Sequence, residues 1–309
     1  MGADGAAQDG AVSGPGTGPE PGPAHAARSA RTTGRTPGGT AYTLHGTGGQ
    51  PVVLVAGAGG TGRIWEHHQV PALTAAGRRV VTFDHGPAPA GSAACGPAPT
   101  GAAELAAVLA ELLTTLELPP CPLVGHSLGA LAVQELLLTD PHRASGALLT
   151  ATRGRSDAVG EALARAEAAA AGAGTRLPPE YEAFVRLVQN LSPRTLADEG
   201  AAAEWLDLFE MAALTGGSAA YRPGPPVPDR LADYGRIAVP VLVVGFADDV
   251  LAPAPLSREV AAAIPGARYA ELPDTGHLGF LERPEAFNTV LLDFLATLAP
   301  TDPGVSRVP

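Results

Sequence analysis

The chain has 309 residues, of which 45% are hydrophobic and 17% are charged, and its formal net charge is −11 at pH 7. All 20 basic residues are arginine and they form no basic run, which argues against a nucleic-acid partner. The length suits one large domain, or one domain with an insertion. No stretch is long and apolar enough to cross a bilayer, so we expect no membrane partner.

The cysteines and the N-terminus indicate a compartment. Cys95 and Cys121 lack the spacing of metal ligands, and two thiols make no disulfide framework, which is typical of a reducing compartment. The N-terminus has no apolar core behind a basic start, as a secretory signal would have. We therefore expect a cytoplasmic protein.

Residues 1–38 and 300–309 are rich in small and polar residues without apolar periodicity, so we expect a disordered N-terminal tail and a flexible C-terminal tail. Between them, apolar runs alternate with helical patterns. In chain order the expected elements are strand 51–56, helix 64–76, strand 79–83, helix 102–118, strand 121–125, helix 128–138, strand 145–150, helices 158–171, 179–191 and 202–214, strand 239–245, helix 256–263, strand 267–272 and helix 284–298.

The order of these elements predicts an α/β fold with an insertion. Apolar strands with little alternation, separated by helices, indicate a mostly parallel, doubly wound sheet that is covered on both faces. Residues 152–235 interrupt this alternation of strands and helices, because they show helical patterns and no strand, which predicts a helical cap. The core then consists of residues 39–151 and 236–299.

The segment Gly125-His126-Ser127-Leu128-Gly129 follows a short apolar strand and precedes a helix. It fits the G-x-S-x-G nucleophile elbow, in which a strained turn exposes the serine hydroxyl. A serine needs this exposure and a paired base to act as a nucleophile. The segment therefore makes Ser127 the candidate nucleophile.

Two later strands end in residues that complete such a site. One runs into Asp248 and Asp249, and the other runs through Asp274 into Gly276 and His277. The carboxyl ends of parallel strands meet at one edge of a sheet, where functional groups gather. The order serine, acid, histidine is that of the α/β-hydrolase fold.

With these motifs the chain resembles the α/β-hydrolase family over residues 40–298. The resemblance covers the Gly-rich loop after an early strand, the elbow, the helical cap, the acid loop that ends at Pro253, and Gly276-His277 followed by Leu281-Glu282-Arg283-Pro284. The richness in Ala, Gly, Pro and Arg suggests a GC-rich coding sequence, as in secondary-metabolism hydrolases of actinomycetes.

The resemblance implies a role for each group. Ser127 attacks a carbonyl carbon, His277 takes its proton and later delivers it to the leaving group, and an aspartate orients His277. A count of three residues on from Gly245 favours Asp248 as that aspartate. The family places a proline four residues after the acid, here Pro253, which favours Asp249, and we choose Asp249. Asp274 is more typical of a turn.

The oxyanion hole should combine the main-chain N–H of Leu128 with one from loop 57–60. By position Ala58 is the expected donor and Gly59 the second choice. Many relatives carry Asp-x-Arg-Gly after the next strand, where this chain has Asp84-His85-Gly86. The missing arginine would deprive Asp84 of its usual partner.

Other residues carry weaker signals. Glu66-His67-His68 has neighbouring side chains that point apart on a helix, so a solvated face is favoured over a metal site. His126 is expected to pack beside the elbow. No cofactor motif occurs, so we expect no cofactor and no metal. Residues that we expect to line an apolar substrate pocket are Gly59, Trp65, Tyr181, Phe184, Trp205, Phe209, Met211 and Leu278.

The leading hypothesis is a cofactor-free serine esterase or thioesterase that acts on a medium-sized apolar acyl compound, such as a polyketide intermediate, through acyl-Ser127. A second hypothesis keeps the fold and uses it for carbon–carbon bond hydrolysis, cofactor-free peroxidase chemistry or cyclisation. A third is a ligand-binding receptor without turnover. The substrate and the oligomeric state stay open.

Overall fold

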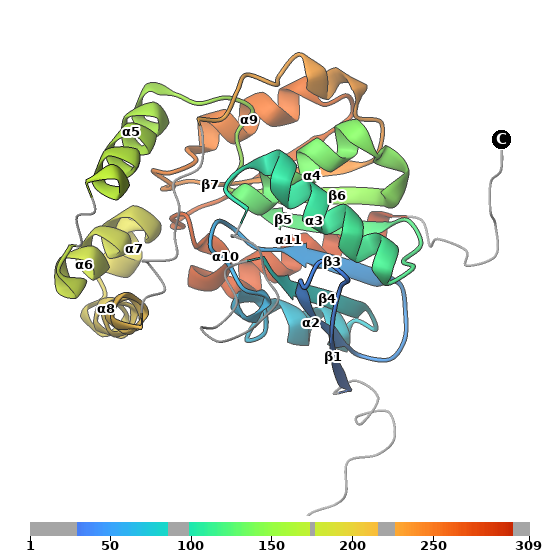
Figure 1. Ribbon diagram of the computed structural model, residues 1–309, viewed down its shortest axis with the longest axis horizontal. Helices are drawn as coiled ribbons and strands as arrows, with labels where there is room; N and C mark the ends of the chain where they lie inside the picture. The colour runs from blue at the N-terminus through green and yellow to red at the C-terminus, as the bar shows by residue number, and fades with distance from the viewer. Residues whose placement is uncertain (1–29, 86–98, 174–176, 216–225, 299–309) are drawn as a thin grey trace, which may run out of the picture.

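The computed structural model describes residues 30–85, 99–173, 177–215 and 226–298. Its centre is an eight-stranded sheet in the order β1-β2-β4-β3-β5-β6-β7-β8 (Figure 1). The strands are β1 (Arg31–Arg35), β2 (Ala41–His45), β3 (Pro51–Val55), β4 (Arg79–Asp84), β5 (Cys121–His126), β6 (Ala144–Thr150), β7 (Val241–Phe246) and β8 (Arg268–Leu272). Strand β2 pairs antiparallel with both β1 and β4, and the other five pairings are parallel, which confirms the mostly parallel sheet.

Helices cover both faces of this sheet. On one face α3 and α4 lie side by side, with α9 beside them, and on the other α2 and α11 pack against the strands (Figure 1). The helical elements are η1 (Gly62–Trp65), α2 (Gln69–Ala75), α3 (Ala102–Thr115), α4 (Leu128–Thr139), η2 (Pro141–Arg143), α5 (Ala158–Gly172), α6 (Pro179–Asn190), α7 (Pro193–Leu196), α8 (Glu199–Leu214), η3 (Asp233–Arg236), α9 (Ala254–Ala263), α10 (Gly279–Glu282) and α11 (Pro284–Thr297).

The central strands explain the two-sided cover. Every residue of β3, β5 and β7 is buried, because successive side chains alternate between the two faces and both faces are core. Val53 and Val55 point into the cluster beneath α3 and α4, whereas Val52 and Leu54 point into the cluster beneath α2 and α11. These continuous apolar strands are what the sequence pattern predicted.

The prediction of a disordered N-terminal tail over residues 1–38 is wrong for residues 31–35. Residues 31–35, which lie within the expected tail of 1–38, form the edge strand β1 and pair with β2. Their sequence is polar and gives no apolar signal, because an edge strand is held by main-chain hydrogen bonds. Tyr42 covers Gly34 across the pair, where a Cβ on the glycine would lie 2.3 Å from the tyrosine Oη. Residues 1–29 and the expected tail at 300–309 lie outside the described residues.

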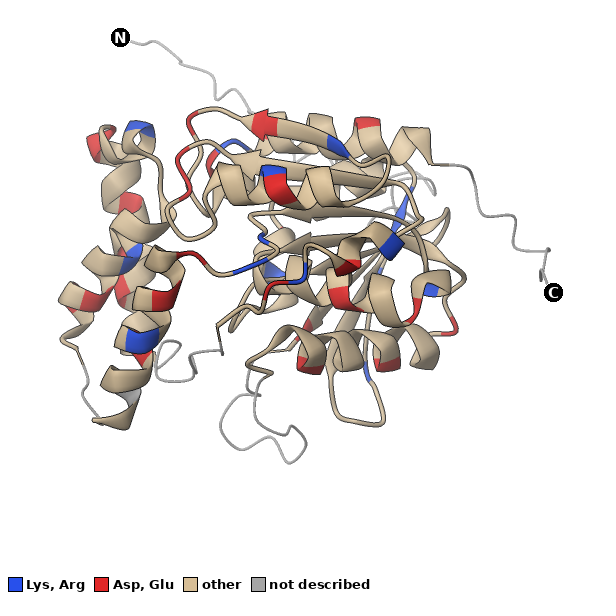
Figure 2. Cartoon of the chain, turned by 90° about the horizontal axis from the view of Figure 1, so that it is seen from above, with Lys and Arg blue, Asp and Glu red and all other residues tan. Residues whose placement is uncertain are grey.

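The inserted helical region comprises α5, α6, α7 and α8 and lies to one side of the sheet (Figure 1). We call these four helices the cap. Acidic residues occur on the cap helices as well as on the core helices (Figure 2). Helix α8 starts three residues before the expected boundary at 202, because the side chain of Asp198 accepts hydrogen bonds from Gly200 N and Ala201 N.

Both ends of the insertion are fastened to α4 by one buried side chain. Gln134 accepts a hydrogen bond from Thr152 Oγ1 and donates one from Nε2 to Tyr234 Oη at 2.5 Å. Thr152 precedes the cap and Tyr234 follows it, so a single glutamine holds both of its connections. No helix in the described part of the chain is long and apolar enough to cross a membrane.

Candidate active site

The nucleophile elbow has the backbone strain that its sequence predicts. Ser127 has φ 53° and ψ −119°, between the end of β5 and the start of α4. Its N–H donates to Thr150 O at 3.0 Å and its carbonyl accepts from Leu131 N at 3.1 Å, so sheet and helix hold the turn from both sides. A left-handed backbone costs a non-glycine residue free energy and occurs most often at functional sites.

The two glycines of the elbow have no room for a side chain. A Cβ on Gly125 would lie 2.6 Å from Ala130 Cα, and a Cβ on Gly129 would lie 2.2 Å from Val55 O. Strand β5, helix α4 and strand β3 therefore approach one another at main-chain distance. This close packing fixes the position from which Ser127 Oγ emerges.

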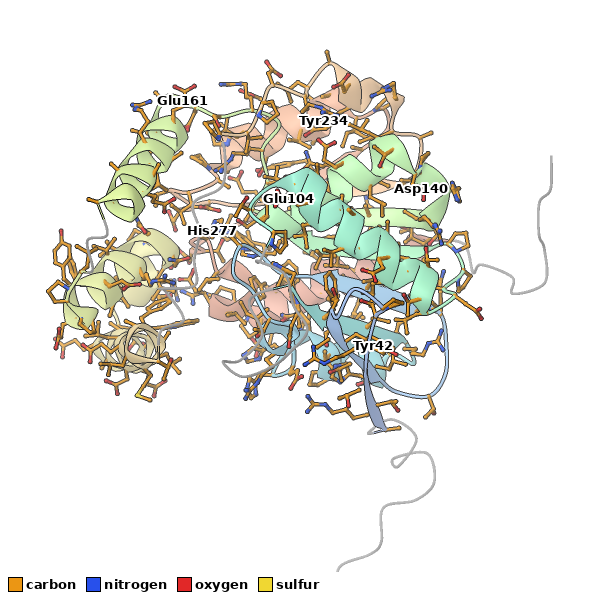
Figure 3. All side chains as sticks on the ribbon, in the orientation of Figure 1. Tyr42, Glu104, Asp140, Glu161, Tyr234 and His277 are labelled. Atoms are coloured by element: carbon orange, nitrogen blue, oxygen red, sulfur yellow. The ribbon has the colours of Figure 1, made fainter. Side chains whose placement is uncertain are left out.

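The structure brings Ser127, His277 and Asp249 together. Ser127 Oγ lies 3.0 Å from His277 Nε2, and His277 Nδ1 lies 2.8 Å from Asp249 Oδ2. His277 and Asp249 are buried, and Ser127 is partly exposed. Figure 3 shows His277 at the side of the core that faces the cap. In this arrangement Ser127 donates its hydroxyl proton to His277, and His277 donates from Nδ1 to the carboxylate.

Of the two adjacent aspartates, Asp249 is the one that contacts His277. Its other oxygen, Oδ1, accepts from Leu251 N at 2.8 Å and Ala252 N at 2.9 Å. Burial by itself would raise the pKa of Asp249, but the charge of His277 and these hydrogen bonds outweigh burial and lower it. The carboxylate therefore stays ionised beside the imidazole.

Asp248 points to a different environment. Burial, and then the nearby charges of Asp274 and Glu282, raise the pKa of Asp248. Asp274 pairs with Arg194 at 3.1 Å and sits in a turn at φ 56°. Neither carboxylate contacts His277 in the described hydrogen bonds.

The expected oxyanion donors flank Ser127. Residues 57–60 form a turn in which Gly60 N donates to Gly57 O at 2.9 Å, and a Cβ on Gly57 would lie 3.2 Å from Ser127 Cβ. The exposed Ala58 follows Gly57 directly. Leu128 is the first residue of α4, where N–H groups have no acceptor within the helix. The roles of both N–H groups stay predictions.

His126 does more than the expected packing. Its Nε2 donates to the main-chain oxygen of His277 at 2.9 Å, and its ring contacts the rings of His277 and Phe280 at 4.9 and 4.8 Å between centroids. Burial, and then the charge of His277, lower the pKa of His126 to about 3. His126 is therefore neutral and holds the backbone of His277. Sequence reasoning missed this contact because 151 residues separate the two.

Asp84 has a partner despite the missing arginine. Its Oδ1 accepts a hydrogen bond from Gly62 N at 2.7 Å. The next residue, His85, is buried and its Nε2 donates to Ala56 O at 3.0 Å. The pair therefore fastens the end of β4 to both sides of the 57–60 turn, and the arginine is not needed for that purpose.

The expected pocket residues do not form one wall. Trp65 is fully buried in the core, where its ring is tilted by 34° against that of Phe280 with 4.5 Å between centroids, so it exposes no surface to a pocket. Gly59 is exposed on the turn, and Leu278 is partly buried beside the base. The expected pocket residues of the cap divide into a half-buried stacked pair and three side chains that are more than half exposed. The pair is Trp205 and Phe209, at 5.7 Å, and the exposed three are Tyr181, Phe184 and Met211.

Trp205 lines a cavity of about 330 Å³ between the cap and α10, together with Thr195, Leu281 and Arg283. A second cavity of about 420 Å³ lies between β1, β2 and η1. Neither is lined by Ser127, His277 or Asp249. Among the described residues no three His, Cys, Asp or Glu side chains are grouped to hold a metal ion, and that includes His67 and His68.

Comparison with known proteins extends these observations. The sequence profile described as "Alpha/beta hydrolase family" matches residues 52–290. A Mycobacterium tuberculosis protein named "Putative non-heme bromoperoxidase BpoC" is 46% identical over 260 residues, which cover 84% of this chain and 98% of that protein. Its crystal structure matches with a TM-score of 0.75 and 44% identity, over 84% of this chain and 96% of the other.

Two further relatives are more distant. A Variovorax paradoxus protein named "Putative carbamate hydrolase RutD" is 30% identical over 272 residues, which cover 85% of this chain and 98% of that protein. A thermophilic esterase from Thermogutta terrifontis has a TM-score of 0.69 at 24% identity, over 88% of this chain and 100% of the other, and shows the shared fold alone. Because the family profile spans most of the chain and BpoC matches almost from end to end, the chain belongs to the alpha/beta hydrolase family.

Proposed function

We propose that the chain is a serine hydrolase that cleaves esters of medium-sized apolar acids through an acyl intermediate on Ser127. The observation that carries the proposal is the unbroken hydrogen-bonded series from Ser127 Oγ to His277, at 3.0 Å, and from His277 to Asp249, at 2.8 Å. The three side chains supply the nucleophile, the base and the orienting acid of a serine hydrolase.

In the first half-reaction His277 Nε2 takes the hydroxyl proton as Ser127 Oγ forms a bond to the ester carbonyl carbon. The carbonyl oxygen gains the negative charge, which the N–H groups of Leu128 and Ala58 would stabilise. Asp249 stabilises the imidazolium. His277 then gives its proton to the leaving alkoxide as the carbon–oxygen bond breaks, and the acyl group remains on Ser127.

In the second half-reaction His277 takes a proton from water, and the oxygen of that water attacks the acyl carbon. The carbon–Oγ bond breaks, the proton returns from His277 to Ser127 Oγ, and the carboxylic acid leaves. The same steps act on a thioester with a thiol as the leaving group. Release of a thioester-bound polyketide intermediate is one reaction that we propose for these steps.

The apolar character of the substrate rests on the cap. The half-buried pair Trp205 and Phe209 is stacked on α8, and Tyr181, Phe184 and Met211 expose more than half of their surface. Exposed apolar surface of this kind is typical of a face that covers a ligand. An apolar acyl chain bound under the cap would remove these side chains from water.

A fluorophosphonate probe, which forms a covalent bond with an activated serine, tests the proposal. We expect the wild type to gain the mass of the probe, and Ser127→Ala and His277→Ala to gain none. Turnover of p-nitrophenyl esters of increasing chain length, and of matched thioesters, then identifies the acyl group and the leaving group. An unlabelled wild type that binds apolar ligands without turnover would support the receptor hypothesis instead.

The name of the 46% identical relative favours a second candidate, which is peroxidase chemistry on the same triad. If hydrogen peroxide replaces water as the second nucleophile, the acyl group leaves as a peracid. The peracid oxidises bromide to hypobromous acid and returns to the carboxylate. Bromination of monochlorodimedone with acetate, peroxide and bromide, with Ser127→Ala as the control, tests this candidate.

A further inference from the structure

Glu282 lies at the point where the cap meets the loop of His277. Its Oε1 accepts hydrogen bonds from Ser192 N at 2.8 Å and from Ser192 Oγ at 2.7 Å. Its Oε2 accepts from Gly276 N at 2.6 Å. One carboxylate therefore joins residue 192, which caps α7, to the residue immediately before the candidate base.

The main chain on both sides of His277 touches the cap. Leu278 N donates to Asn190 O at 3.1 Å, and a Cβ on Gly276 would lie 2.6 Å from the same oxygen and 2.8 Å from Ser192 N. The cap segment 190–192 thus lies at van der Waals distance from the main chain of the loop. Gly276 permits this approach because it has no side chain.

Three consecutive residues of the loop are held by three different parts of the chain. Gly276 N donates to Glu282, His277 O accepts from His126, and Leu278 N donates to Asn190 in the cap. The contact of His126 comes from the elbow, whereas the other two involve the cap or its anchor. The orientation of the His277 ring therefore depends on the cap as well as on the core.

From this geometry we propose that Glu282 is a positioning residue, which holds His277 in register with Ser127 by tying the base loop to the cap segment 190–192. The inference rests on the proposed function, since it assigns His277 the part of the base. Glu282 contacts no reacting atom itself. It makes activation of Ser127 conditional on a docked cap.

The chemistry of the carboxylate suits this task. Two main-chain N–H groups, of Ser192 and Gly276, point at two different oxygens, and only a carboxylate offers an acceptor to both. Glutamine has one acceptor oxygen and places N–H groups opposite the other donor. A buried N–H that loses its acceptor is costly, so Glu282→Gln must release either the cap or the base loop.

The other side-chain contacts between the cap and residues 274–283 are weaker. Arg194 pairs with Asp274 at 3.1 Å, but 67% and 48% of their side chains are exposed, and an exposed ion pair contributes little. Arg283 Nη1 donates to Thr195 Oγ1 at 3.3 Å. Glu282 is thus the residue whose loss should uncouple the two parts.

The experiment compares Glu282→Gln and Glu282→Ala with two control variants. Arg194→Ala removes the exposed ion pair, and Glu285→Gln removes an exposed carboxylate three residues further along the chain. Each variant is measured for kcat and KM on a short p-nitrophenyl ester, for the rate of fluorophosphonate labelling, and for its thermal midpoint.

We expect kcat and the labelling rate to fall together, about 10-fold in Glu282→Gln and roughly 100-fold in Glu282→Ala, with KM within a factor of about three. A fall in kcat and labelling rate with little change in KM is expected when the base is displaced and substrate binding is unaffected. Arg194→Ala and Glu285→Gln should match the wild type.

Two results would overturn different claims. If the wild type labels and Glu282→Gln labels equally fast, the positioning role is wrong and the serine hydrolase proposal stands. If the wild type does not label, the proposed function fails and the inference fails with it. If Glu282→Ala does not fold, the one-atom change Glu282→Gln still decides.

Discussion

His126 donates a hydrogen bond from Nε2 to the main-chain oxygen of His277, 2.9 Å away. The proton on Nε2 fixes the tautomer, so Nδ1 carries the lone pair, and this atom is buried with no hydrogen-bond partner among the described residues. A second proton would place an unpaired charge in the core. The residue that precedes the nucleophile therefore supports the base only in its neutral form.

The first prediction concerns pH. Burial lowers the pKa of His126 from 6.5 to about 3, so between these values the unfolded chain binds a proton that the folded chain does not. The free energy of unfolding must then fall as the pH falls through this window, by about 1.4 kcal/mol per pH unit. In His126→Gln the amide retains a donor to His277 O and has no such titration.

Urea unfolding at pH 7 and pH 5 measures this effect. We expect the wild type to lose roughly 2 kcal/mol more than His126→Gln between the two pH values. His67→Gln makes the same chemical change at an exposed ring and should keep the wild-type slope. Equal slopes in the wild type and His126→Gln would contradict a neutral His126.

The second prediction separates the two aspartates. Asp249→Asn replaces the acceptor of His277 Nδ1–H and favours the wrong tautomer, so we expect kcat/KM to fall about 10³- to 10⁴-fold. Asp248→Asn removes a charge that Asp274 and Glu282 repel, and it should change kcat/KM less than about threefold. Initial rates on one ester decide between them, and a larger loss in Asp248→Asn would refute the assignment.

The third prediction concerns packing at the elbow. In Gly129→Ala the new Cβ would lie 2.2 Å from Val55 O and 2.5 Å from Ala56 O, both main-chain atoms that cannot move aside. We expect a loss of more than about 3 kcal/mol in the free energy of unfolding, or no soluble protein.

Gly200→Ala is the matched control for that substitution. Gly200 is exposed in the first turn of α8, and its nearest atom to a new Cβ is Asp198 Oδ1 at 3.5 Å. Alanine there should raise the free energy of unfolding by up to about 1 kcal/mol. Denaturant midpoints of the two variants should therefore move in opposite directions, and a tolerated alanine at 129 would mean that helix α4 and strand β3 are further apart.

The fourth prediction concerns the buried thiol. Burial raises the pKa of Cys121 to about 12, and the side chain is fully buried at the start of β5. The thiolate that reacts with alkylating reagents is therefore almost absent in the folded protein. Iodoacetamide at pH 8 should leave the Cys121 peptide unmodified in the native state and modify it after unfolding in urea, as read by mass spectrometry. Rapid native modification would contradict the burial.

Local sequence determined much of this protein. The apolar runs at 51–56, 121–125 and 239–245 have no alternation, and this pattern follows directly from strands that are buried on both faces. The elbow is also local, because strand, strained serine and helix are contiguous and Gly125 is required by the main chain of Gly129 and Ala130, which follow it closely in sequence. Hence Ser127 and the parallel sheet were readable without coordinates.

Long-range contacts decided the rest. Asp248 and Asp249 are adjacent and chemically identical, and what separates them is that Asp249 points to His277, 28 residues later, while Leu251 N and Ala252 N fix its other oxygen. The strand β1 has a polar sequence and exists because β2 offers it hydrogen bonds. Trp65 follows a loop at the site but is buried against Phe280, 215 residues away.

Glu282 shows the same division. Its place in Leu281-Glu282-Arg283-Pro284 is visible in the sequence, but its partners Ser192 and Gly276 lie 90 and 6 residues away and donate to different oxygens of the carboxylate. A pattern of residues specifies which elements form, since propensity and periodicity act over one or two turns. The direction of a side chain and the atom that it meets are settled only when the elements pack, and in this protein that packing joins the cap to the histidine beside Ser127.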